Sequence, residues 1–195
     1  MKKLALPLFF LVLASIPYVN AADTGTAADS LVAIETERGY RSGILVKIDD
    51  GVFVLTSQDV FKDSFVSMKT ISGKSLQPLS YEAVSDEQNG TLRIKTDSNS
   101  AVASIEDANL KDEEVTVFRT DPSFGIMSAV KAGMQKGSLK LPPPGKDKPA
   151  PSYLRDIVGS PVLNKKGNIV GIVGLKGASL PSTKTFTVKS ETLAL

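Results

Sequence analysis

The sequence predicts an all-β protein built from two packed antiparallel β-barrels. Short runs with alternating apolar and polar residues recur along the chain, as is typical of half-buried strands. The runs form two series of roughly 75 residues each, the size of a small barrel. No long stretch carries the apolar spacing of an amphipathic helix. This periodicity by itself is equally compatible with a β-sandwich.

The first series opens with an apolar run at residues 31–34. Residues 43–48 and 52–56 flank Asp49-Asp50-Gly51, which predicts a tight hairpin because Gly accepts the positive φ of such a turn. A second hairpin is expected around Ser72-Gly73-Lys74. Its strands would span 65–71 and 75–83, a further strand is expected at 91–96, and one helical turn at 58–63.

The second series begins near residue 113. Residues 114–119 alternate cleanly, and 162–173 read as a hairpin with a polar turn at Asn164-Lys165-Lys166-Gly167. Two more strands are expected at 126–134 and 183–188. The expected barrels therefore span residues 22–108 and 109–195.

A proline-rich stretch, LPPPGKDKPAP, lies at residues 141–151 and holds five of the chain's eleven prolines. Proline fixes φ and donates no backbone hydrogen bond, so this stretch predicts a surface loop with polyproline II character rather than a central strand. The alternative is a ligand for a proline-recognising partner.

The N-terminus has the features of a secretory signal peptide. Lys2 and Lys3 precede a short apolar run, and Val19-Asn20-Ala21 forms a small-residue cleavage site. Residues 1–21 are therefore expected to be removed, which predicts an exported protein, periplasmic or secreted. The absence of Cys favours a bacterial source. No membrane span is expected after cleavage, since no later apolar run is long enough.

Composition excludes several classes of function. Cleavage would remove two lysines and no acid, so the mature chain is formally neutral, which argues against nucleic-acid or anionic-membrane binding. The chain has no His and no Cys, which rules out a Ser-His-Asp triad, thiol catalysis and His- or thiolate-bound metals. No acidic cluster has calcium-loop spacing, so neither a metal nor a cofactor is expected.

Three stretches carry a family resemblance. Residues 41–61, RSGILVKIDDGVFVLTSQDVF, resemble the strand, Asp-Gly turn and L-T-x-x-H-V segment of trypsin-like (chymotrypsin-fold) serine proteases, especially the HtrA-type members. Residues 86–95 resemble the stretch of that family whose Asp orients the catalytic base. Residues 156–162, DIVGSPV, with the glycine-punctuated hairpin that follows them, resemble the nucleophile loop. The resemblance covers residues 30–175 and implies two packed barrels.

The same resemblance places unreactive residues at all three catalytic positions. Asp59 stands where the family has His, Gly90 (or, one position back, Asn89) where it has Asp, and Val158 where it has the nucleophilic Ser. Val158 carries no heteroatom, and Gly90 has no side chain. An ionised Asp is a poor base at neutral pH, because its pKa is about 3.9. The resemblance therefore implies a pseudoprotease, which is not an enzyme.

The expected function is binding of a peptide or protein partner by this exported, inactive scaffold. A protease-like groove can accept an extended peptide as an added strand. Two alternatives are a structural subunit of an exported complex, and a hydrolase of Ser-Lys type that uses Ser160 with Lys165 or Lys166. The oligomeric state is not indicated. Candidate groove residues are Asp156, Val158, Ser160, Val173 and Gly174.

Overall fold

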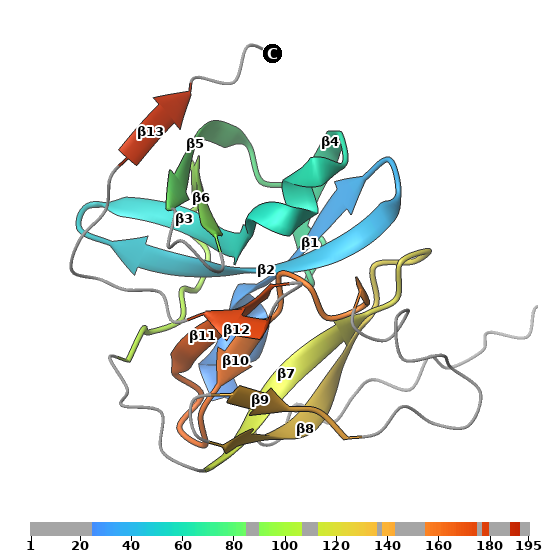
Figure 1. Ribbon diagram of the computed structural model, residues 1–195. Coiled ribbons are helices and arrows are strands. Elements are labelled where there is room, and N and C mark those ends of the chain that lie inside the picture. Colours follow the sequence, from blue (N-terminus) through green and yellow to red (C-terminus); the bar gives the residue numbers. More distant parts are fainter. Residues whose placement is uncertain are drawn as a thin grey trace, which may run out of the picture.

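The chain folds into two curled antiparallel sheets, each a half-barrel, which confirms the predicted fold class (Figure 1). This computed structural model describes residues 25–84, 90–106, 113–135, 138–142, 155–174, 177–179 and 188–191. The predicted signal peptide and residues 143–151 of the proline-rich loop lie outside the described residues. The described part contains no helix that is long and apolar enough to cross a membrane.

The first sheet has seven strands in the order β13-β5-β6-β3-β2-β1-β4. A short 3-10 helix, η2 (Gly25–Ser30), leads into it, and a second one, η3 (Gln58–Lys62), follows β3 where a helical turn was predicted. The strands are β1 (Leu31–Thr36), β2 (Gly39–Ile48), β3 (Gly51–Ser57), β4 (Phe65–Thr70), β5 (Pro78–Val84), β6 (Thr91–Thr96) and β13 (Val188–Glu191).

The predicted Asp-Gly hairpin joins β2 to β3, with Ile48 opposite Gly51. One detail differs from the prediction. The positive φ falls on Asp49, at 51°, and not on Gly51. Asp tolerates the left-handed region better than most residues, because its short side chain bonds to the local backbone.

The predicted turn at Ser72-Gly73-Lys74 forms, but the strand expected after it pairs with β4 only briefly. Gly73 adopts a φ of 89°, Lys69 lies opposite Ser75, and Leu76 N–H donates to Met68 O at 3.0 Å. The long strand expected at 75–83 begins instead at Pro78, and this strand, β5, pairs with β6 and β13.

The second sheet has six strands in the order β12-β11-β10-β7-β8-β9. The predicted hairpin at 162–173 is confirmed, since β10 pairs with β11 around a turn capped by Asn164 Oδ1, which accepts hydrogen bonds from the N–H groups of Lys166 and Asn168. The strands are β7 (Glu113–Thr120), β8 (Met127–Gln135), β9 (Ser138–Lys140), β10 (Pro161–Leu163), β11 (Ile169–Gly174) and β12 (Gly177–Ser179).

The end of the chain does not stay with the second sheet. Residues 109–195 were expected to form the second barrel, yet β13 pairs with β5 in the first sheet. The expected strand at 183–188 lies outside the described residues except for Val188, where β13 begins.

Apolar side chains pack into one cluster inside each sheet and a third between them. The alternation along β2 builds two of these clusters, because Leu45 points into the first sheet while Ile44 and Val46 face the second. Phe118, Leu163, Ile169 and Ile172 meet them from the other side. The two sheets therefore share one buried interface.

A carboxylate fastens the connection between the sheets to the β10–β11 hairpin. The side-chain amides of Asn164 and Asn168 donate to Glu106 Oε2 at 2.7 and 2.8 Å, and Glu106 N–H donates to Ile169 O at 3.0 Å. These bonds, that from Asn168 foremost, hold the pKa of Glu106 below its ordinary value of 4.5, and Lys166 adds to the effect.

Replacing this carboxylate should lower stability in a pH-dependent way. A lowered pKa in the folded state means that Glu106 stabilises the fold above pH 4.5, and that this contribution is lost as the pH falls through the folded-state pKa. We expect Glu106→Gln to lower the thermal midpoint at pH 7, with the gap to the wild type closing in acid. Glu37→Gln, at an exposed acid, is the control, and a pH-independent gap would contradict this account.

Candidate functional site

The helical turn η3 brings the three predicted catalytic positions together where the two sheets meet. Gln58 N–H, beside Asp59, donates to Gly90 O at 2.9 Å. Val60, one residue further on, packs in the same apolar cluster as Val158. Positions 59, 90 and 158, which are far apart in the sequence, therefore surround one short helix.

Asp59 is held at the rim of this site. Its Oδ1 lies 2.5 Å from Lys62 Nζ, and its Oδ2 accepts a hydrogen bond of 3.3 Å from Ser57 Oγ. Ser57 also caps η3, since its Oγ accepts from Asp59 N–H at 3.2 Å. The carboxylate therefore has a cation and a hydroxyl as partners, and its place at the start of η3 is a stabilising one.

The side chain of Gln58 fills the space beside Gly90. A Cβ built on Gly90 would lie only 2.1 Å from Gln58 Cδ and 2.2 Å from its Oε1. A side chain at position 90 and the present position of the Gln58 amide exclude each other. The sequence motifs did not identify Gln58 as part of the site. The one sequence feature that could have done so is its position next to Asp59.

Val158 lies inside the apolar cluster of the first sheet, although it belongs to the loop before β10. Its side chain is 4% exposed. Its N–H points back to Arg155 O at 3.4 Å, and Ser160 N–H donates to Ile157 O at 3.0 Å, so residues 155–160 form a tight turn. The side chain supplies no nucleophile, and its own N–H is directed into the turn.

Gly159 brings the 155–160 loop into close contact with β2 and β3. Its φ is +83°, and a Cβ there would lie 2.3 Å from Ser42 O and 2.4 Å from Thr56 Oγ1. On the other side, Gly159 N–H donates to Val173 O at 2.8 Å. Only glycine fits, because both the dihedral angle and the space exclude a side chain.

Buried polar groups accompany this contact. Ser42 Oγ shares a hydrogen bond with Thr120 Oγ1, and Thr56 Oγ1 donates to Ser42 O at 2.7 Å. Asp156 accepts from Arg119 Nε at 3.2 Å, and its main-chain oxygen accepts from Thr120 N–H at 2.8 Å. Side chains of the two sheets therefore satisfy one another at the interface.

Ser160 has a structural place. Its side chain is fully buried, accepts a hydrogen bond from Phe118 N–H at 2.7 Å and donates to Pro161 O at 3.1 Å. Lys166 Nζ lies 3.7 Å from Glu106 Oε1 in the turn that follows β10. Neither contact joins Ser160 to a lysine, so the geometry gives the Ser-Lys alternative no support.

The predicted groove residues lie mostly below the surface. Val158, Ser160 and Val173 are buried, and Val173 uses both its N–H and its C=O to bind the 159–160 loop. Gly174 is half-buried and pairs with Gly177 in β12. A peptide at this place would meet few of their side chains, and their role in recognition stays a prediction.

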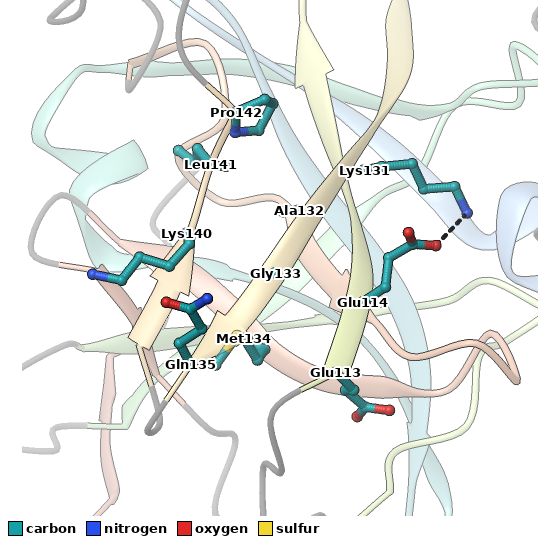
Figure 2. Close-up of a pocket in the computed structure, with 10 residues that line it drawn as sticks. All are labelled: Glu113, Glu114, Lys131, Ala132, Gly133, Met134, Gln135, Lys140, Leu141 and Pro142. Carbon is teal, nitrogen blue, oxygen red and sulfur yellow. Dashed lines mark ion pairs between the residues drawn. The ribbon is translucent and has the colours of Figure 1, made fainter.

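A separate hollow of about 550 Å³ lies on the second sheet over β8. Figure 2 shows Gly133 between Glu114 and Lys131 on one side and Lys140 and Gln135 on the other. Glu114 and Lys131 form an ion pair of 3.7 Å. Leu141 and Pro142 complete the wall. These residues offer mixed charge and apolar surface, but no pairing of a nucleophile with a base.

No group of three potential metal ligands comes together within the residues that the structure describes.

Comparison with known proteins identifies the fold. Rv3671c from M. tuberculosis H37Rv, in an inactive mutant form, is similar at a TM-score of 0.57 and 16% identity, over 83% of this chain and 85% of that one. Deg5 is similar at a TM-score of 0.56 and 13% identity, over 83% of this chain and 88% of that one. The serine endoprotease from Yersinia pestis is similar at a TM-score of 0.56 and 15% identity, over 91% of this chain and 63% of that one. No family model and no curated protein matches the sequence.

This chain therefore has the trypsin-like serine protease fold, which the sequence motifs predicted. At these identities the likeness concerns the fold alone.

Gly159 should tolerate no side chain. We expect Gly159→Ala to lower the free energy of unfolding by about 3 kcal/mol, because it combines left-handed strain with overlap against rigid backbone. Gly73→Ala is the matched control, since Gly73 also has a positive φ, +89°, but nothing lies within 4 Å of its Cβ position. We expect a loss of about 1 kcal/mol there. Equal losses in urea unfolding would contradict the close approach.

Gly90 and Gln58 should be energetically coupled. We expect Gly90→Ala to cost about 1 kcal/mol, because the flexible Gln58 amide must move away, and to cost much less in a Gln58→Ala background. Urea unfolding of the two single variants and the double variant measures the coupling. Additive losses would show that the two groups do not compete for space.

Proposed function

We propose that this protein is an exported, non-catalytic member of the trypsin-like fold that binds a peptide segment of a protein partner. The observation that carries the proposal is Val158, an apolar residue at the predicted nucleophile position, packed in the core of the first sheet. A buried valine there stabilises the scaffold and performs no acyl transfer.

The surroundings of Val158 support the same proposal. The chain has no His to act as the base. The Gln58 amide fills the space into which a carboxylate at position 90 would extend, and the Val158 N–H is directed to Arg155 O, whereas an oxyanion site needs donors aimed at the substrate. Each of these three features favours a fixed scaffold over a reactive cleft.

The architecture of this scaffold favours the binding of a partner. Antiparallel sheets offer main-chain hydrogen bonds to an extended segment at an edge, and this mode needs no catalytic group. The formally neutral chain after residue 21 favours a peptide over a nucleic acid.

Capture of peptides without cleavage tests the proposal. The mature chain, residues 22–195, would be applied to a diverse peptide array, and the masses of retained peptides would be measured. We expect defined peptides to be retained intact. Cleaved products would refute the non-catalytic assignment. Absence of any retained peptide would refute peptide binding, and a protein recovered at fixed stoichiometry would then indicate a structural subunit.

Restoring the catalytic residues should not restore proteolysis. We expect Asp59→His, Gly90→Asp and Val158→Ser together to give no measurable cleavage of an unfolded substrate, because Gln58 obstructs the carboxylate and the 155–160 turn directs the Val158 N–H away. Val158→Ser alone should cost about 1–3 kcal/mol of stability, because it places a hydroxyl among apolar side chains. Rapid turnover by the triple variant would show that the cleft was competent throughout.

A further inference from the structure

The far end of the chain completes the outer edge of the first sheet. β13 pairs antiparallel with β5, with Val188 opposite Val84 and Glu191 opposite Tyr81. Within the part of the chain that the structure describes, β5 is the only element with which β13 makes extensive contact. Figure 1 shows β13 as the outermost strand of this sheet, beyond β5. Main-chain pairing with β5 is the contact that the structure describes for this strand.

The opposite edge of the same sheet is covered in another way. The chain that leaves β4 folds back on it at once, so that Lys74 O accepts from Thr70 N–H at 2.8 Å and Leu76 N–H donates to Met68 O at 3.0 Å. Leu76 is buried in the core. This cover cannot leave without opening the core. In contrast, β13 comes from more than half the chain away in sequence.

We propose that β5 is a strand-acceptor site, at which β13 is exchanged for an extended segment of a partner protein. When β13 leaves, the main-chain N–H and C=O groups of β5 that face away from β6 lose their partners, and an incoming strand satisfies them in the same geometry. This inference rests on the proposed partner binding and gives it a place other than the buried surroundings of Val158.

β13 then acts as an internal competitor. Residues 180–187 connect it to β12. A tether this short holds a strand at an effective concentration on the order of millimolar. A partner segment must compete with β13 at that effective concentration, so β13 sets the partner concentration above which binding occurs. When no partner is present, β13 keeps the edge paired.

The residues of β5 indicate which segments bind best. Glu82 is half-buried, faces Arg93 on β6 and lies opposite Ser190 of β13. A basic residue at the position of Ser190 would add an opposite-charge pair across the strands. The preferred partner segment is therefore extended, with Lys or Arg opposite Glu82, and should bind about two- to fivefold tighter than β13 itself.

The chain's own C-terminal strand supplies the first probe. A fluorescent peptide of residues 184–195, KTFTVKSETLAL, would be titrated into the wild-type chain and into a full-length variant carrying Lys189→Pro and Ser190→Pro. Proline removes main-chain donors from β13, so the variant should release it. We expect the variant to bind the peptide at least tenfold more tightly than the wild type does. The same peptide with both prolines is the control and should not bind.

Hydrogen exchange on the unaltered chain keeps the inference testable if the proline variant fails to fold. We expect the amides of residues 188–191 to exchange at least tenfold faster than those of β3 and β6, because β13 opens alone. Equal protection, or a folded proline variant that does not bind the peptide, would overturn the inference.

Failure of this inference can be told apart from failure of the proposed function. Foreign peptides retained by the array while the β5 edge takes no strand would leave partner binding intact and place it elsewhere. Binding of KTFTVKSETLAL to the variant, with no foreign peptide retained, would instead confirm the acceptor edge and refute the partner.

Discussion

The approach of the 155–160 loop to the first sheet is the contact on which the rest of the structure depends. Gly159 brings its backbone against Ser42 and Thr56, and on either side of it Val158 and Ser160 are buried in different surroundings. Polar groups that are buried in such a close contact need hydrogen-bond partners. Val173, Phe118 and Arg155 supply several of those partners.

This requirement also shapes the chemistry of the site. Hydrogen-bond groups that hold the loop against the sheet are engaged and are not aimed at a ligand. Among them are the Val158 N–H and the Ser160 hydroxyl. The polar groups at η3 are engaged in the same way, since Ser57 and Lys62 bind Asp59. In this region the residues contribute to the rigidity of the interface, and we place recognition at a sheet edge instead.

Sequence patterns predicted the elements that depend on interactions between neighbouring residues. The alternation along β2 predicted a strand, the Asp49-Asp50-Gly51 turn predicted its hairpin, and the motif around Asp59 predicted a short helix followed by a shared site. Long-range contacts decided the rest. β5 pairs with β6 and β13 instead of extending the short return onto β4, and the Gln58 amide took the space at Gly90 from 32 positions away in sequence. Pairing of β13 with β5 leaves no local signature at all.

The crossing of β13 to the first sheet has a consequence in time. β13 lies far beyond β5 in the sequence, so the edge at β5 stays without its outer strand until the two distant segments meet. Pairing over so long a stretch of chain must also close a large loop, which slows folding. Pairing of β13 with β5 is therefore expected to be slower than formation of the hairpins of the first sheet, and until it occurs this sheet carries an open edge that can pair with another chain.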